Sequence, residues 1–232
     1  MRAAVQRALA LVSNGFRIGV GSGRASSAFI RALGRRVQQG FCVEAVVASN
    51  ASESLAREVG VPLIDLGEDV ELDIVVDGAD EVAPNLDLIK GWGGSLVRER
   101  IVASAAKRMV ILVGPEKLVQ TLGERGCIPV EIVPLARGCA ARRLKALGLV
   151  PILRLNKDGS PFITNNHNLI LDCALTSPLK DAAAARHMEA QILDVTGVVE
   201  TGMFLGWATE VFVGHPNGQV DALTRKAGSL KT

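Results

Sequence analysis

The sequence is short of aromatic residues: it has six phenylalanines, two tryptophans and no tyrosine among 232 residues. A surface that stacks the bases of nucleic acids needs exposed aromatic side chains, so this shortage argues against a nucleic-acid partner. The formal net charge of +2 is also too small to indicate a nucleic-acid-binding or membrane-binding surface. No apolar run is long enough to cross a membrane, so we expect no membrane partner either.

The cysteine and histidine patterns that are typical of metal sites and disulfide frameworks are absent. These residues are widely spaced, without a C-x-x-C pair or a zinc-binding spacing: Cys42, Cys127, Cys139, Cys173, His167, His187 and His215. The chain is long enough to bury a full core without disulfides, so we expect reduced, buried thiols and a cytoplasmic location. Gln6 and Arg7 interrupt the apolar N-terminal segment, which favours a helix over a secretion signal. We predict neither a metal nor a cofactor.

Over the first half of the chain, short apolar runs alternate with helical patterns. Strands are expected at "FRIGVG", "CVEAVVA", "VPLI", "LDIVV" and "MVILV". Helices are expected at residues 26–38, from Asn50 to Gly60 and at residues 95–107, with Asn50 and Glu53 as a capping pair. This alternation predicts an α/β fold with a Rossmann-like, mostly parallel sheet that is covered on both faces.

The pattern changes from about Cys127. Strands are expected at "CIPVEIVP", "LVPILRL" and "LILDCAL", and a helix at residues 136–147. A last helix is expected in "SPLKDAAAARHMEAQIL", with Ser177 as its N-cap and Pro178 in its first position. The tail "TEVFVGHPNGQV" is expected to return to the first sheet. We therefore predict a Rossmann-like catalytic domain at 1–126 plus 207–232, and a smaller α+β domain at 127–206.

Ligands of parallel α/β sheets bind at the carboxyl ends of the strands, and two strand ends are candidates here. The first is the glycine-rich segment "GVGSGRASS", which contains Gly21, Ser22, Gly23 and Arg24. Backbone N–H groups before a helix suit a phosphate, although this loop is neither a Walker A motif nor a clean G-x-G-x-x-G. A tight turn without a ligand is the alternative. Ser49, after the next strand, suits a second polar wall of the pocket or simply caps a helix.

The second strand end carries acidic residues. Asp77 and Asp80 follow a buried strand, and Lys90 lies in "IKGWGG". Glycines in that segment allow the backbone to approach a ligand closely: Gly91, Gly93 and Gly94. The alternative is a D-G turn with solvated acids.

Glu99 lies on the helix that follows. Helical spacing places it in an apolar stripe, together with Leu96, Val102, Ala103 and Ala106. A carboxylate in such a stripe is uncommon unless it is paired or used, and it suits a general base. A buried ion pair is the alternative. Two acids, a lysine and this glutamate, without a metal pattern, favour proton transfer beside a carbonyl, and the phosphate loop favours a phosphosugar isomerase.

The segment "DGADEVAPNLDLIKGWGGSLVRERIVASAAKR" resembles the signature of type A ribose-5-phosphate isomerases, read as D-G-A-D-E, I-K-G-x-G-G and R-E. The resemblance runs over nearly the whole chain. "GVGSG" is similar to the glycine loop of the family, "CIPVEIVP" to its P-V-E-V-x-P segment and "TNNHNLILDC" to its T-D-N-G-N-x-I-L-D segment. The resemblance implies interconversion of D-ribose 5-phosphate and D-ribulose 5-phosphate through an enediolate, in the non-oxidative pentose phosphate pathway. It also implies a metal-independent homodimer or homotetramer.

By position, the resemblance implies the catalytic acids, lysine and general base: Asp77, Asp80, Lys90 and Glu99. It implies phosphate contacts at Ser22 and Gly23 and a substrate contact at Lys117. The chain departs from the family pattern around the expected ligand contacts, at Arg24, Ala25, Trp92, Gly114, Asn165 and His167. An isomerase of a different phosphorylated aldose and a non-catalytic sugar-phosphate-binding protein are therefore kept as alternatives.

Overall fold

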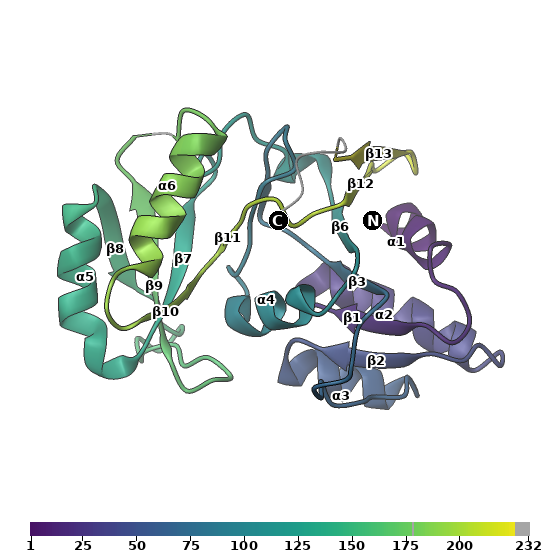
Figure 1. Ribbon diagram of the computed structural model, residues 1–232. Helices are drawn as coiled ribbons and strands as arrows, with labels where there is room; N and C mark the ends of the chain where they lie inside the picture. Colours follow the sequence, from purple (N-terminus) through teal and green to yellow (C-terminus); the bar gives the residue numbers. More distant parts are fainter. Residues whose placement is uncertain (178, 226–232) are drawn as a thin grey trace. The chain divides into compact units, whose positions relative to one another are not determined.

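The computed structural model describes residues 1–177 and 179–225, which form two compact units (Figure 1). Of the described residues, the first unit comprises 1–79, 98–117 and 206–225. The second unit comprises residues 80–97 and 118–205. No helix in the described part of the chain is both long and apolar enough to cross a membrane.

The first unit contains a six-stranded sheet with the order β13-β12-β6-β3-β1-β2. Its strands are β1 (Arg17–Val20), β2 (Glu44–Val47), β3 (Ile74–Asp77), β6 (Met109–Val113), β12 (Glu210–Gly214) and β13 (Val220–Thr224). All neighbours are parallel except β12 and β13, which form an antiparallel hairpin. This confirms the predicted α/β fold with a mostly parallel sheet, including the return of the tail to the first sheet.

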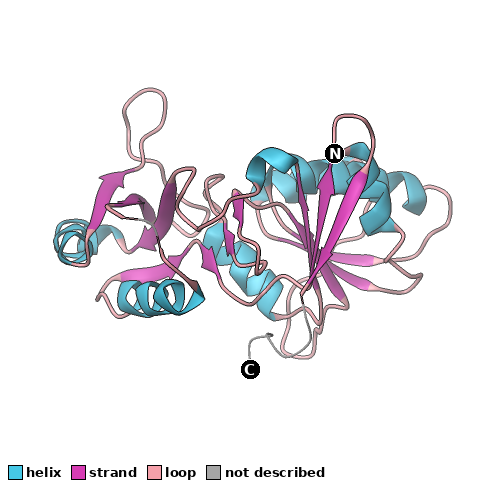
Figure 2. Ribbon diagram, turned by 90° about the horizontal axis from the view of Figure 1, so that it is seen from above, coloured by secondary structure: helices cyan, strands magenta, loops and turns pink. Residues whose placement is uncertain are grey.

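Strand alternation explains how this sheet is covered (Figures 1 and 2). Ile18 and Val20 point to one face and belong to a core shared with the helices α1 (Arg2–Leu9), α2 (Gly23–Val37) and α3 (Asn50–Glu58). Gly19 points to the other face, where a methyl group built on it would lie 2.6 Å from Cγ1 of Val102 in α4 (Leu96–Ser104). Helices therefore cover both faces of the sheet. The polar side chains predicted to form the site follow the carboxyl ends of β1 and β3.

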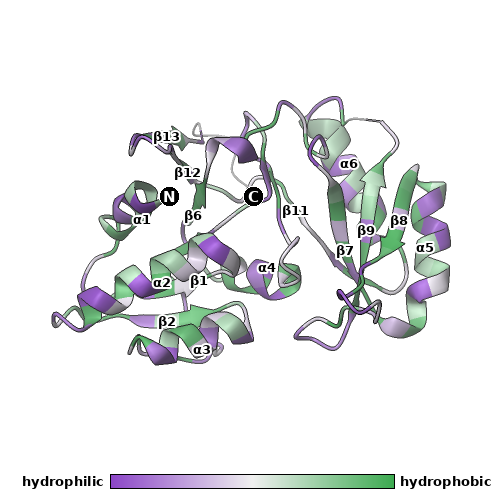
Figure 3. Cartoon of the chain, turned by 180° about the vertical axis from the view of Figure 1, so that it is seen from behind, coloured by the Kyte–Doolittle hydropathy of each residue, from purple (hydrophilic) through white to green (hydrophobic). Residues whose placement is uncertain are grey.

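The second unit is an α+β arrangement around an antiparallel sheet with the order β10-β7-β9-β8. Its strands are β7 (Cys127–Ile132), β8 (Leu149–Leu153), β9 (Leu169–Leu175) and β10 (Val198–Thr201), and its helices are α5 (Arg137–Ala146) and α6 (Ala182–Leu193). One face of this sheet packs against apolar residues of both helices, and β8 is largely green in Figure 3. A small antiparallel sheet joins β4 (Glu81–Val82), β5 (Leu88–Ile89) and β11 (Met203–Phe204). Two short 3-10 helices are η1 (Pro115–Lys117) in the first unit and η2 (Pro134–Ala136) in the second.

Two predicted helix caps were wrong. The N-cap of α3 is Ser49 instead of Asn50, and its Oγ accepts a hydrogen bond of 3.1 Å from the Ser52 N–H. The N-cap of α6 is Asp181 instead of Ser177, because Asp181 Oδ1 accepts from the Ala184 N–H at 2.8 Å. The predicted role of Pro178 lies outside the described residues. Both helices offered two polar residues near their start, and only the backbone conformation decides which one caps.

Two further predictions need correction. The segment "VPLI" forms a single parallel bridge, between Leu63 and Ala45, instead of a strand. Pro62 contributes a carbonyl to the Ala45 N–H but has no N–H of its own to continue a ladder. The thiols are free, but Cys42 and Cys139 are exposed instead of buried.

The compact units differ from the predicted domains in two segments. Residues 80–97 and 118–126 pack with the second unit, whereas the prediction assigned them to the Rossmann-like domain. The first of these segments holds β4 and β5, which are too short for a hydrophobic pattern to predict. Whether the units fold as independent domains with the predicted boundaries stays a prediction.

Candidate active site

The first unit brings the acidic end of β3 against the glycine loop after β1. The Asp77 carboxylate is 1% exposed, and its Oδ1 accepts from Ser26 Oγ at 3.0 Å and from the Gly78 N–H at 2.7 Å. A methyl group built on Gly21 would lie 1.8 Å from Cγ of Asp77. Glycine is therefore needed at position 21 because the Asp77 carboxylate occupies the space of a side chain.

Ser22 connects this loop with Glu99. The Ser22 hydroxyl donates a hydrogen bond of 2.5 Å to Oε1 of Glu99, across 77 residues of sequence. Glu99 is 4% exposed, and the side chains that share its stripe on α4 are buried as the helical spacing predicted: Leu96, Val102 and Ala103. Ala106 lies beyond the end of α4, which is Ser104. A nearly buried carboxylate is thus held at the rim of the loop that we expect to bind phosphate.

The remaining predicted residues of the glycine loop differ in exposure. Gly23 begins α2 with a φ of +81°, a conformation that favours glycine. The side chain of Arg24 is exposed in the first turn of the same helix. Ser49 is buried, and its Oγ caps α3 and donates to Ser52 Oγ at 3.0 Å. Ser52 in turn donates to the Gly21 carbonyl at 2.8 Å, so Ser49 supports the loop through the cap.

Lys117 ends the short helix η1 and is half-buried. Gly114, the residue directly before η1, is one of the positions at which the chain departs from the family pattern, which has an aspartate there. A methyl group built on Gly114 would lie 2.1 Å from Oε2 of Glu116, so the Glu116 carboxylate folds back over this glycine. A carboxylate is therefore present beside position 114 although the residue there is glycine.

The second unit contains Lys90, Asp80 and the glycines of "IKGWGG". Lys90 is 2% exposed, and its ammonium lies 5.5 Å from the ring centre of Phe204. The backbone N–H of Lys90 donates to the Gly202 carbonyl at 2.8 Å. A methyl group built on Gly202 would lie 2.2 Å from the Lys90 carbonyl oxygen. The main chain at Lys90 is thus fixed beside Gly202, a position that local sequence reasoning did not single out.

The loop after Lys90 makes a tight turn. Gly91 and Gly94 have φ values of +97° and +88°, and the Gly94 N–H donates to the Gly91 carbonyl at 3.0 Å. Gly93, between them, is exposed. Oδ2 of Asp80 accepts from the Trp92 N–H at 2.9 Å, so this loop orients the Asp80 carboxylate.

Sequence reasoning missed two residues that hold predicted site residues in place. Ser26 binds Asp77, and Arg154 donates to the carbonyls of Gly91 and Trp92. Ser26 follows the glycine loop by three residues, so the helical repeat from Gly23 was a usable signal. Arg154 lies 63 residues from Gly91 and has no comparable signal.

The titration of one nearby group is perturbed by burial. Desolvation, followed in size by the charge of Asp172, raises the pKa of the Cys127 thiol to about 12. This thiol is therefore neutral near pH 7 and donates to Oδ1 of Asp172 at 3.3 Å. Within residues 1–177 and 179–225, no three His, Cys, Asp or Glu side chains are grouped as a metal site would need.

Comparisons with known proteins identify the family of this chain. The sequence model of the family Ribose 5-phosphate isomerase A (phosphoriboisomerase A) matches residues 44–218. Ribose-5-phosphate isomerase A of Deinococcus radiodurans is 44% identical over 225 residues, which cover 96% of either chain. The solved ribose 5-phosphate isomerase A from Methanocaldococcus jannaschii is 37% identical with a TM-score of 0.88, covering 96% of this chain and 97% of that chain. A solved D-ribose-5-phosphate isomerase in complex with phospho-erythronic acid is 33% identical with a TM-score of 0.90, covering 97% of both chains. This chain therefore belongs to the ribose 5-phosphate isomerase A family.

Proposed function

We propose that this protein is a ribose-5-phosphate isomerase, which interconverts D-ribose 5-phosphate and D-ribulose 5-phosphate. The observation that carries the proposal is the Glu99 carboxylate, nearly buried and hydrogen-bonded to Ser22 of the glycine loop. A general base in reach of a phosphate loop suits proton transfer on a phosphorylated sugar. Family membership supports the same substrate, since the relatives are named for it.

In the proposed reaction, the Glu99 carboxylate removes the proton from C2 of the open-chain aldose. The electron pair forms the C1–C2 double bond, and the C1 carbonyl oxygen becomes an oxyanion that the Lys90 ammonium stabilises. Glu99 then returns its proton to C1, while the proton of the C2 hydroxyl passes to the C1 oxygen, which yields the ketose. Positioned acid–base groups typically contribute about 10²- to 10⁴-fold in rate.

Asp77 and Asp80 are proposed to bind sugar hydroxyls and to help open the furanose ring. Asp77 is suited to this role because Ser26 and Gly78 orient its carboxylate, and Asp80 because the Trp92 N–H does so. The phosphate is proposed to bind N–H groups of the glycine loop, with Lys117 as a further contact. The relative that was solved with phospho-erythronic acid supports a phosphosugar ligand.

The test is a direct isomerisation assay with ribose 5-phosphate and with a panel of other phosphorylated aldoses. We expect turnover of ribose 5-phosphate to exceed that of every other sugar. Preference for another aldose would support the alternative that the protein is an isomerase of a different phosphorylated aldose. Tight binding without turnover would support a non-catalytic sugar-phosphate-binding protein. We also expect activity to survive exhaustive chelation; loss of activity that Mg²⁺ restores would make Asp77 and Asp80 metal ligands.

We also propose that the protein forms a homodimer or homotetramer. Large apolar side chains of the second unit are exposed in this single chain: Leu135, Ile152, Leu155 and Ile163. Exposed apolar surface of this kind is typical of interfaces. Sedimentation equilibrium at several protein concentrations would measure the mass of the assembly, and a strictly monomeric protein would contradict the proposal. The cytoplasmic location stays a prediction.

A further inference from the structure

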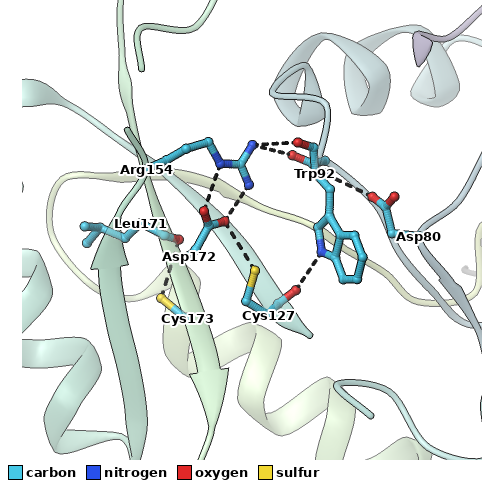
Figure 4. A network of polar contacts seen from close by, with 8 residues as sticks. Asp80, Trp92, Cys127, Arg154, Leu171, Asp172 and Cys173 are labelled. Carbon is cyan, nitrogen blue, oxygen red and sulfur yellow. Dashed lines mark hydrogen bonds and ion pairs between the residues drawn. The ribbon is translucent and has the colours of Figure 1, made fainter. Parts of the chain in front are cut away.

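Arg154 reaches the loop that follows Lys90 from the end of β8 (Figure 4). Its Nη1 donates to the carbonyl oxygens of Gly91 and Trp92, at 3.0 and 3.1 Å. The guanidinium is held in turn by Asp172 of β9, through Nε to Oδ2 at 2.9 Å and Nη2 to Oδ1 at 2.5 Å. The Arg154 side chain is only 12% exposed. A two-bond pair of this kind fixes the plane of the guanidinium, so the direction of Nη1 is also fixed.

Trp92 fastens the same loop to β7. Its indole N–H donates to the Cys127 carbonyl at 3.0 Å, and a methyl group built on Gly126 would lie 2.5 Å from Cζ2 of its ring. The tryptophan ring thus fills the space beside Gly126. We call Arg154, Asp172, Trp92 and Cys127 the loop anchor.

The loop anchor bears on Asp80 through the planarity of one peptide. Arg154 draws the Gly91 carbonyl to one side, so the N–H of the same trans peptide, which belongs to Trp92, points to the opposite side. That N–H is the donor to Oδ2 of Asp80. A rotation of this peptide would remove the hydrogen bond from Asp80 and change the backbone next to Lys90.

We infer that Arg154, held by Asp172, is a positioning residue for the isomerase reaction, which sets the conformation of the loop that carries Lys90 and orients Asp80. The inference rests on the proposed function, because it takes Lys90 and Asp80 as groups that act on the substrate. Arg154 acts through the loop and is not a catalytic residue. Misplacement of reacting groups by about 1 Å can lower the rate about 10²-fold. We therefore expect loss of Arg154 to lower kcat.

The first test is Arg154→Lys, which keeps the charge beside Asp172 but lacks the planar fork that serves Asp172 and both carbonyls together. We expect kcat with ribose 5-phosphate to fall about 10- to 100-fold while KM changes less than about threefold. Hydrogen exchange should accelerate at the amides of residues 91–95 and stay unchanged in β6. An unchanged kcat together with unchanged exchange would overturn the inference.

A second variant separates positioning from stability. The double variant Arg154→Met with Asp172→Leu removes both buried charges, so neither is left without its partner. If Arg154 only stabilises the fold, this variant should keep wild-type kcat per folded molecule. We expect a low kcat in a protein whose unfolding midpoint is close to that of the wild type; wild-type kcat would overturn the inference.

The matched control is the ion pair between Arg108 and Glu210 in the first unit, removed as Arg108→Gln with Glu210→Gln. We expect this variant to keep kcat and the exchange rates of residues 91–95. The two proposals can fail separately. An inactive wild type would refute the proposed function, whereas the exchange measurement tests the loop anchor without any substrate.

Discussion

The glycine loop of the first unit and that of the second unit are held in different ways. The loop after β1 is held by small groups: Ser26 binds Asp77, Ser52 binds the Gly21 carbonyl and Ser22 binds Glu99. The loop after Lys90 is held by larger side chains: Arg154 reaches its carbonyls from the end of β8, and its own Trp92 indole donates to the Cys127 carbonyl of β7. Both loops need glycine for space and for backbone conformation: Gly21 leaves room for a carboxylate and Gly23 has a positive φ, while Gly91 and Gly94 have positive φ values and are crowded as well.

This difference indicates where each loop tolerates change. In the first loop, the Asp77 carboxylate leaves no space for an additional carbon atom at Gly21, so a substitution at this position should be damaging. In the second loop, the conformation depends on Arg154 and on Asp172, which holds its guanidinium, so substitutions of these two residues should be damaging. The variants at Glu99, Gly21, Gly23 and Arg24 below test the first loop, as the Arg154 variants test the second.

The largest effect is expected for Glu99→Gln. The amide keeps the shape of the side chain but cannot accept a proton from C2, so turnover should fall by about 10²- to 10⁴-fold or more. Steady-state kinetics would measure the loss, and circular dichroism with a phosphosugar binding assay would confirm a folded, binding-competent protein. Near-normal turnover would remove Glu99 from the mechanism.

The next effect is expected for Gly21→Ala. The added methyl group would lie 1.8 Å from Cγ of Asp77, which forces the carboxylate or the strand to move. We expect a loss of about 1–3 kcal/mol in the free energy of unfolding and a strong loss of kcat. Denaturant unfolding and kinetics would measure both.

Gly23→Ala is the matched control for this crowding. A methyl group on Gly23 would meet no atom within 4 Å, and only its φ of +81° opposes the change. The free energy of unfolding should therefore fall by about 1–2 kcal/mol, which is the backbone strain of a left-handed alanine, and the Asp77 carboxylate should stay in place. Equal loss of kcat in both variants would show that crowding of Asp77 is not the cause.

A smaller effect is expected for Arg24→Ala. If the exposed guanidinium binds the phosphate in the ground state and the transition state alike, KM should rise about 5- to 10-fold with little change in kcat. An unphosphorylated sugar should show no such weakening, because it offers nothing for the arginine to hold. An unchanged KM would leave Arg24 as a surface residue and the phosphate to the backbone of the first loop.

The smallest effect concerns His167, which has a φ of +62° at a position where the family pattern has glycine. A histidine in the left-handed region costs about 1–2 kcal/mol of folding free energy, which glycine would avoid. Part of this stabilisation is lost because glycine makes the unfolded chain more flexible. His167→Gly should therefore stabilise the protein by up to about 1 kcal/mol, with unchanged kcat. Chemical denaturation would measure the change in the free energy of unfolding. A destabilised variant would show that contacts of the imidazole stabilise the fold by more than the backbone strain costs.

Local sequence patterns were enough to predict the fold class and to select the candidate residues. Apolar runs and helical stripes are local patterns, so they predicted the parallel sheet, the strand ends and the buried side of α4 on which Glu99 lies. Short strands such as β4 and β5, and the choice between Ser49 and Asn50 as a cap, depend on packing and escaped the pattern.

The contacts that hold the site residues, by contrast, become visible in the folded chain alone. The bond from Ser22 to Glu99 spans 77 residues, and the bond from Arg154 to the Gly91 carbonyl spans 63. The sequence around a hydroxyl or a guanidinium does not indicate which distant group it will bind. That partner depends on which segments the fold places next to each other. The need for glycine at position 21 has the same origin: the carboxylate of Asp77 fills the space where a side chain would be.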